Sequence, residues 1–459
     1  MTQTLPLADT TGVATPPRGL HRVLGMAFGL AIAVGATVGG GIVRTPGEVA
    51  AALPNAALFI AAWVFGGVNA LLGANIFSEL GAMMPRAGGP FVYARRAFGD
   101  GVAFFVGYAD WLAWCLGAVA LTMIVGEYMG ALFPPLAGHA IAVDFLTLAS
   151  IVAIQWLGVR SSGRTQEITT VLKAVALLVL VVAAFVLPRP EVVAPPVAAP
   201  QGIALVLAFA VAMQGVIFTY ESYYAVIYCG EEMRDPGREI PRSMFRAVFL
   251  IIAIYLLVNL ACLAVLPIGR IAGDPFVGGT VARVLFGSAG DTIIRLIMIV
   301  SVVGTINAIL MALSRVLLAM GRSGLFPRQA ALVNEGGTPY AALAVSAIVI
   351  AIFLATGSFA AVLGLSALFI VVKYTACFTA LFALRRREPD TPRPYRARGY
   401  PLLPALALAV ALALMVALVA SDLRASAMVL ALLVVSWPLS YLVRRATRTE
   451  APPAVPPAE

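Results

Sequence analysis

The sequence has little charge for its length. Only 12% of its 459 residues are Asp, Glu, Lys or Arg, whereas 61% are hydrophobic. A soluble domain carries about 25% charged residues, so this chain lacks the side chains to cover a water-facing surface. Its apolar runs are long and continuous, without the alternation of a membrane barrel strand. Because lipid cannot satisfy free backbone groups, the sequence predicts an all-α integral membrane protein.

Cysteine and histidine are also scarce. The four cysteines lie in or beside apolar runs, and the two histidines fall on opposite predicted sides of the membrane. No spacing typical of metal ligands or of a nucleophile with its base is present, so we predict no metal, no cofactor and no enzymatic activity. The net charge of +9 is spread over short loops. This distribution is typical of a membrane protein rather than of a nucleic-acid-binding one.

Twelve apolar runs are long enough to cross a bilayer. They cover residues 23–43, 57–78, 102–132, 139–158, 170–187, 202–228, 245–266, 291–317, 340–356, 359–384, 402–421 and 425–443. We therefore expect a transmembrane domain over residues 23–443, with an N-terminal tail over 1–22 and a C-terminal tail over 444–459. Most of the 31 Lys and Arg residues fall on the same side as the N-terminus. This bias predicts that both termini are cytoplasmic and that the protein lies in the cell inner membrane.

The first run contains three consecutive glycines, Gly39, Gly40 and Gly41. Each glycine costs about 1 kcal/mol of helix propensity relative to alanine, so three in a row weaken the helix at one point. The alternative is close helix packing through small residues such as Gly35 and Gly39. Packing normally spaces its glycines by four, however, and the run therefore favours an interrupted first span.

The sixth run carries a polar cluster of Thr219, Tyr220, Glu221 and Ser222. An acidic residue at that depth is a functional candidate, although hydrogen bonds to other helices could also satisfy it. Runs one and six open the two successive groups of five, and interrupted helices in matching places indicate a transporter site. Free N–H groups at such breaks suit a carboxylate and free carbonyls suit an ammonium, which together match an amino acid.

Further segments extend this pattern along the chain. In order, they are Val38–Val43, Glu79–Gly81 with Pro85, Gly88, Gly89 and Tyr93, Gly158–Arg160 with Lys173, Phe218–Tyr223, Glu231–Arg242 and Arg393–Pro401. Over roughly residues 20–405 the chain resembles the amino acid–polyamine–organocation (APC) superfamily, and within it the sodium-independent bacterial amino acid permeases. Six matching segments in the expected order make this resemblance specific.

The resemblance implies a leucine-transporter-like fold of twelve helices, with a five-plus-five inverted repeat and broken spans 1 and 6. It implies a secondary transporter that moves amino acids by alternating access, sodium-independent and driven by protons or by exchange. A permease for polyamines or other organocations and a non-transporting nutrient sensor are the alternatives. The expected partners are the small-molecule substrate, protons and lipid, with no obligatory protein partner. The substrate contacts implied by the resemblance are Val38, Gly39, Gly40, Gly41, Ile42, Phe218, Thr219, Tyr220, Glu221 and Ser222.

Lys173 matches a span 5 lysine that takes the place of a sodium ion in sodium-independent relatives. The resemblance therefore implies a coupling role for it. From the sequence alone, Lys173 could instead extend to the cytoplasmic interface.

Two departures from the family pattern leave the substrate open. Gly40 stands where many relatives have Ser or Thr, and Ser222 replaces the usual glycine. Glu221 could select a cationic substrate, although acidic residues at this place also occur in carriers of neutral amino acids.

Several other intramembrane polar residues have no assigned partner. Lys373 is a solitary charge within run ten, Glu127 is expected to reach the interface, and Asn307 is either an interhelical hydrogen-bonding group or a site group. The tryptophans are interpreted mostly as interfacial anchors; they are Trp63, Trp111, Trp114, Trp156 and Trp437.

Overall fold

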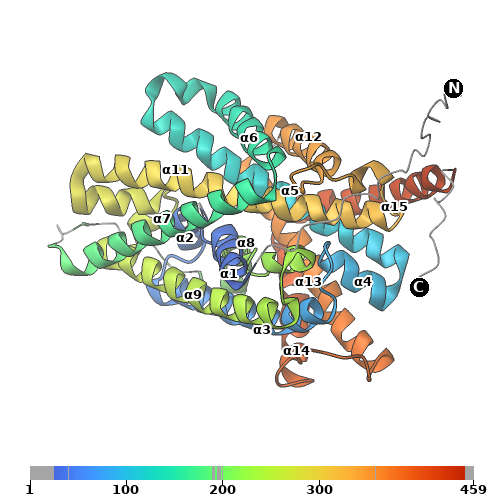
Figure 1. Ribbon diagram of the computed structural model, residues 1–459. Coiled ribbons are helices and arrows are strands. Elements are labelled where there is room, and N and C mark those ends of the chain that lie inside the picture. Colours follow the sequence, from blue (N-terminus) through green and yellow to red (C-terminus); the bar gives the residue numbers. More distant parts are fainter. Residues whose placement is uncertain are drawn as a thin grey trace, which may run out of the picture.

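The structure is a computed structural model that describes residues 25–39, 41–188, 192–193, 198, 200–356 and 358–449. All regular elements within these residues are helices, gathered into one bundle (Figure 1). In order, they are α1 (Met26–Thr37), α2 (Gly41–Ala52), α3 (Ala56–Met83), α4 (Pro90–Phe98), α5 (Asp100–Leu132), η1 (Pro134–His139), α6 (Ala140–Trp156), α7 (Val159–Val186), α8 (Ile203–Tyr220), η2 (Ala225–Glu232), α9 (Pro236–Val265), α10 (Ile268–Ile271), α11 (Val277–Arg322), η3 (Arg328–Ala331), α12 (Tyr340–Thr356), α13 (Phe359–Arg387), α14 (Leu402–Ser421) and α15 (Leu423–Thr449).

Among the described residues, ten helical stretches are long and apolar enough to cross a membrane. The broken pairs α1–α2 and α8–η2 each count as one of them. Two shorter apolar helices, α12 and the 423–438 part of α15, lie where runs nine and twelve were predicted. The chain is therefore a multi-pass helical membrane protein.

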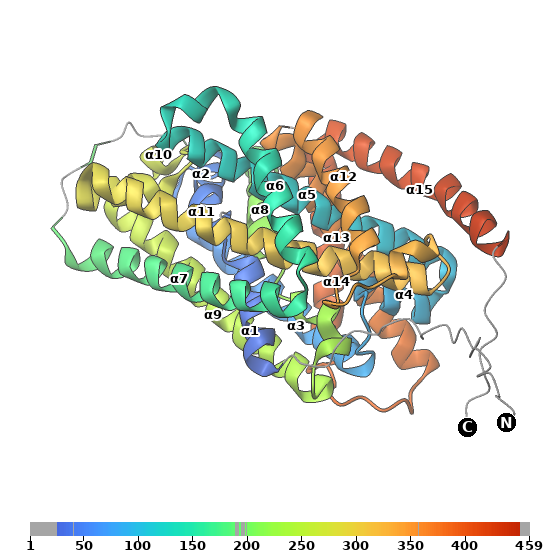
Figure 2. The same cartoon turned by 45° about the horizontal axis from the view of Figure 1, so that its top comes forward.

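The helices divide into a central set and a peripheral set. In the most apolar window of α1–α2, 76% of the residues are buried, and in that of α11 72% are. The matching values are 17% for η1–α6 and 28% for α14, so those helices present most of their apolar side chains to lipid. Helix α1 packs against α7, α9 and α11, and α2 packs against α8. Figure 2 shows α11 and α7 running alongside α1, with α15 at the edge of the bundle.

Several helix bounds differ from the sequence prediction. Helix α4 follows the turn at Gly88 and Gly89, where the predicted runs left a loop. At Gly88 the φ angle is +108°, and an added Cβ would lie 2.4 Å from the Cβ of Ala319, so only glycine fits. Helix α11 begins well before residue 291 and bends at Gly287, where φ is +71°. Helix α15 continues to Thr449, into the segment 444–459 that was predicted to be a tail.

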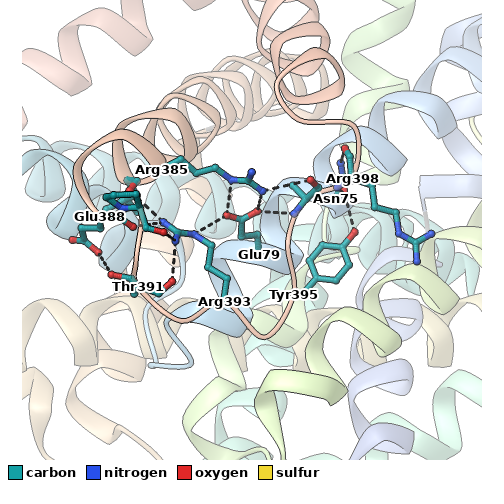
Figure 3. A network of polar contacts seen from close by, with 11 residues as sticks. Asn75, Glu79, Arg385, Glu388, Thr391, Arg393, Tyr395 and Arg398 are labelled. Carbon is teal, nitrogen blue, oxygen red and sulfur yellow. Dashed lines mark hydrogen bonds and ion pairs between the residues drawn. The ribbon is translucent and has the colours of Figure 1, made fainter.

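One buried carboxylate ties α3 to α13 and to the segment that follows α13 (Figure 3). Glu79 accepts hydrogen bonds from Arg385 at 2.9 and 2.5 Å and from the N–H of Ala397 at 2.6 Å. It also forms an ion pair with Arg393 at 3.1 Å. Two of the sequence segments that carried the family resemblance, around Glu79 and around Arg393, therefore meet in space. This contact joins the C-terminal ends of α3 and α13 to the segment that follows α13.

Candidate functional site

The first span is interrupted where the glycine run predicts it. Helix α1 ends at Thr37, Val38 has extended backbone angles (φ −78°, ψ 94°), and α2 begins at Gly41. The break also allows close packing, since a Cβ at Gly39 would lie 2.6 Å from Oγ1 of Thr305 in α11. Because the first N–H groups of any helix lack intrahelical acceptors, the start of α2 offers donors in the middle of the bundle. Gly40 lies outside the described residues.

The sixth span is interrupted directly after the polar cluster. Helix α8 ends at Tyr220, Glu221 leaves the helical conformation (φ −48°, ψ 174°), and Ser222 has a φ of +71°. A non-glycine residue in this left-handed region is strained by about 1 kcal/mol or more. Glycine adopts this conformation without strain, in keeping with the glycine that the family resemblance implies at this position.

A hydroxyl group from α9 contacts both breaks. The OH of Tyr255 lies 2.6 Å from the carbonyl of Thr37 at the end of α1 and 2.9 Å from the carbonyl of Thr219 at the end of α8. Thr37 also reaches the other break, since its Oγ1 lies 3.2 Å from the carbonyl of Glu221. The two interrupted helices are therefore joined side by side rather than separated by other elements.

A cavity of about 30 Å³ lies between the two breaks. This space holds about one or two water molecules, so the site is nearly closed in the conformation described here. Its wall mixes apolar surface with several hydroxyl groups and one carboxylate. The lining residues are Ala36, Thr37, Gly39, Gly41, Ala113, Trp114, Gly117, Leu121, Phe218, Thr219, Glu221, Ser222, Thr305, Ile309 and Ser366.

Lys173 binds the carbonyl end of α1. Its side chain, on α7, is fully buried. The Nζ group donates to the carbonyls of Gly35 (2.7 Å) and Val38 (2.6 Å) and to Oγ1 of Thr305 (3.1 Å). An ammonium has three donors, and here each has an oxygen acceptor. A positive charge at the carbonyl end of a helix is also favoured by the helix dipole.

Lys373 lies on the other side of the site and has two carboxylate partners. Its Nζ group is 2.6 Å from Oε1 of Glu221 and 3.0 Å from Oδ1 of Asp110, and all three side chains are buried. Tyr224 contacts both Lys373 and Glu221, and Tyr374 donates to Oε2 of Glu221 at 2.7 Å. The Glu221 carboxylate lines the cavity and is hydrogen-bonded to the ammonium of Lys373 and to the hydroxyl groups of Tyr224 and Tyr374.

Comparison with known proteins shows the family of the chain. The family model described as amino acid permease matches residues 20–441. The chain belongs to this family, which is part of the APC superfamily. The permease is 26% identical to the serine/threonine exchanger SteT of Bacillus subtilis (strain 168), over 86% of this chain and 90% of that protein. It is 24% identical to the branched-chain amino acid permease BcaP of the same strain, over 88% and 89%.

The same similarity extends to animal proteins. The permease is 25% identical to the human large neutral amino acids transporter small subunit 2, over 82% of this chain and 72% of that protein. The family and these relatives are transporters. The permease accordingly transports amino acids across a membrane, as its sequence predicts.

The structure brings most of the predicted site residues to the cavity wall. Gly39, Gly41, Phe218, Thr219, Glu221 and Ser222 all line it. Three others do not. Val38 contributes its carbonyl to Lys173, Ile42 is fully buried elsewhere, and the Tyr220 hydroxyl turns away to bind the carbonyl of Trp63 at 3.1 Å.

Sequence analysis missed Asp110 and the role of Trp114. Trp114 is only 3% exposed and lines the cavity, so it is not an interfacial anchor. Its Nε1 group donates to the OH of Tyr228 at 3.0 Å, and that OH lies 2.8 Å from each carboxylate oxygen of Asp110. Lys373 is the one charged residue of run ten, and Asp110 shares run three with Glu127 alone. Because intramembrane charges usually pair with opposite charges, the sequence could have predicted an ion pair between Asp110 and Lys373.

Two further residues left open by the sequence have partners. Glu127, whose side chain is partly exposed, pairs with Arg44 of α2, and Arg44 lies over the ring of Phe359 at 3.9 Å. Asn307 accepts a hydrogen bond from Gln155 at 2.9 Å, which joins α11 to α6. Asn307 is thus an interhelical hydrogen-bonding residue and is not among the cavity-lining ones.

Proposed function

We propose that the permease is a secondary active transporter of the cell inner membrane that carries amino acids by alternating access. In this proposal the chain has twelve spans over residues 23–443, the last two helices being additional to a five-plus-five inverted repeat. Both termini are cytoplasmic, in keeping with the distribution of basic residues. The ten long apolar helices and the two shorter ones supply the twelve spans.

The observation that carries the proposal is the meeting of two broken helices at one cavity. The start of α2 presents backbone N–H groups, which bind the substrate carboxylate. The carbonyls at the end of α8, around Phe218 and Thr219, bind its ammonium group. Phe218 and Trp114 supply apolar surface beside these polar groups. An amino acid therefore matches the site through its backbone, and the remaining wall faces its side chain.

Lys173 makes the transport sodium-independent in this proposal. Unwound carbonyls at a broken helix are the groups with which transporters of this kind coordinate a sodium ion. Here the ammonium of Lys173 already bonds to the carbonyls of Gly35 and Val38 and to Thr305. It joins α7 and α11 to the end of α1 and so couples movement of the first span to its neighbours.

Exchange is the proposed mode of transport. The named activity of the Bacillus serine/threonine exchanger favours exchange over net uptake. Proton symport is the other mode open to a sodium-independent carrier, and the experiment below distinguishes the two.

The test is uptake into liposomes containing the purified permease, with a radiolabelled panel of amino acids and polyamines. Each compound is measured with unlabelled amino acid inside, with an inward proton gradient and with neither. We expect uptake only when amino acid is present inside, unchanged when choline replaces sodium. Lys173→Ala should abolish it, whereas Lys173→Arg reports whether a cation alone suffices.

Three results would contradict the proposal. Uptake that requires sodium would remove the role of Lys173, and uptake driven by the proton gradient with empty liposomes would replace exchange by symport. Folded permease that transports no amino acid of the panel would contradict the assigned substrate class.

A further inference from the structure

Four buried side chains that can carry charge lie at the cavity or directly behind its wall, and in their charged forms the charges cancel. Lys173 lies at the end of α1, and Lys373 with Asp110 and Glu221 lies at the end of α8. Two ammonium groups and two carboxylates sum to zero. Because an unbalanced charge is costly inside a membrane protein, the site is matched to a ligand that brings no net charge.

Their positions also match the dipole of an amino acid. The lone positive charge of Lys173 lies at the first break, where the substrate carboxylate is proposed to bind. The group formed by Asp110, Glu221 and Lys373 carries one negative charge in total and lies at the second break, where the ammonium is proposed to bind. The carboxylate and the ammonium of a zwitterion each meet a charge of opposite sign. No further charge remains at either break to balance a charged substrate side chain.

Glu221 is the carboxylate among the cavity-lining residues, and three hydrogen-bond donors already contact its oxygens. Oε1 accepts from Lys373 and Tyr224, and Oε2 accepts from Tyr374. Lys373 itself is enclosed by aromatic rings, with its Nζ 4.9 Å from the ring centre of Tyr224 and 5.4 Å from that of Trp114. Neither Lys373 nor Asp110 lines the cavity.

We infer that Lys373 determines the charge class of the substrate, restricting the permease to amino acids with uncharged side chains. It acts through Glu221, whose negative charge it balances, and is thus a positioning residue rather than a substrate contact. With Lys373 in place, the negative charge of Glu221 is balanced and three of its about four acceptor sites are filled. Glu221 therefore attracts the amine of lysine, arginine or a polyamine only weakly. This inference rests on the proposed function and names the substrate class of the same site.

The first experiment compares neutral and cationic substrates for the permease and for Lys373→Gln in liposomes. Initial exchange rates are measured for serine, leucine, lysine, arginine and agmatine. The unaltered permease should prefer the neutral amino acids by about tenfold or more. Lys373→Gln lowers the charge sum to −1 and should shift the ratio of cationic to neutral uptake upward by about tenfold or more.

Two matched variants separate charge from structure. Lys373→Arg keeps the positive charge and should retain the neutral preference. The double variant Glu221→Gln/Lys373→Gln returns the sum to zero and should restore that preference, which a merely structural role of Lys373 would not. Asp110→Asn changes the sum in the opposite direction, to +1, and should increase glutamate uptake relative to serine.

The inference is overturned if the unaltered permease takes up lysine or arginine as fast as leucine and serine. It is also overturned if folded Lys373→Gln keeps the neutral preference, or if the double variant fails to restore it. Ligand-induced thermal stabilisation in detergent, with lysine against leucine, measures the same preference without transport. If Lys373→Gln does not fold, Asp110→Asn serves as the test in its place. The inference is then overturned if Asp110→Asn has the same substrate range as the unaltered permease. Failure of the proposed function would differ from all of these, since no amino acid of any charge would then bind or move.

Discussion

The permease buries two lysines beside one cavity, and it satisfies them in opposite ways. Lys173 bonds to two backbone carbonyls and a hydroxyl group, all of them neutral. Lys373 bonds to two carboxylates and a phenol. Neutral acceptors leave the charge of Lys173 uncompensated locally, whereas Lys373 is overcompensated. The pair shows that charge in this bundle is balanced across the site rather than within each contact.

The two lysines also differ in the kind of group on which their contacts depend. Two of the three acceptors of Lys173 are backbone carbonyls, which no substitution elsewhere can remove. Lys373 depends on the side chains of Asp110 and Glu221, which can be changed together with it. Loss of Lys373 should therefore be much easier to compensate by a second mutation than loss of Lys173.

The largest expected loss of stability is for Lys373→Met. It leaves two carboxylates buried without their cation, which typically costs ~3–5 kcal/mol. The thermal unfolding midpoint in detergent should fall accordingly, and Asp110→Asn/Lys373→Met should recover a large part of the loss. A single variant as stable as the unaltered permease would contradict the ion pairs described here.

The next largest loss is expected for Lys173→Met, at roughly 2 kcal/mol. The carbonyls of Gly35 and Val38 lose their donor inside the protein, and each unsatisfied group costs about 1–3 kcal/mol, part of which relaxation returns. On adding Asp110→Asn, the same unfolding measurement should show only a small recovery, because the charge sum returns to zero while the two carbonyls stay without a donor. A recovery as large as that of Asp110→Asn/Lys373→Met would mean that the carbonyl contacts of Lys173 contribute little to stability.

The smallest effect is expected for Thr305→Val, which removes one of the three acceptors of Lys173. A hydrogen bond to a charged group contributes about 1.5–3 kcal/mol at most, and valine keeps the shape. We expect a loss of ~1 kcal/mol in unfolding together with slower exchange. Thr375→Val is the matched control, because that hydroxyl bonds within α13 to the carbonyl of Val371. An equal effect of both substitutions on exchange would argue against a role of the Lys173 contact.

The two helix breaks could be predicted from the sequence because their causes are local. Consecutive glycines weaken a helix, and a polar cluster stands out in an apolar run. The partners of Lys373 could not be predicted in this way. Asp110 lies in α5, Lys373 lies in α13 and Glu221 directly follows α8. Only tertiary packing decides which of many apolar neighbours surrounds each of these side chains.

Individual side-chain directions were also beyond the sequence. Tyr220 and Ser222 belong to the same polar cluster, yet Ser222 lines the cavity and Tyr220 packs against Trp63. Tyr220 and Ser222 point in different directions because α8 ends between them, with Tyr220 as its last residue and Glu221 as its C-cap. A shift of one residue in that end would exchange the residues that face the cavity.

The hydroxyl group of Tyr255 has a consequence for the energy of the transport cycle. A phenol has one hydrogen, but here it has two acceptors, the carbonyls of Thr37 and Thr219. If α1 and α8 move apart in the proposed transport cycle, the hydrogen can follow either carbonyl, so one hydrogen bond can be kept while the other is lost. Tyr255 would then connect α9 to one broken helix at a time, and separating the two breaks would cost one hydrogen bond rather than two.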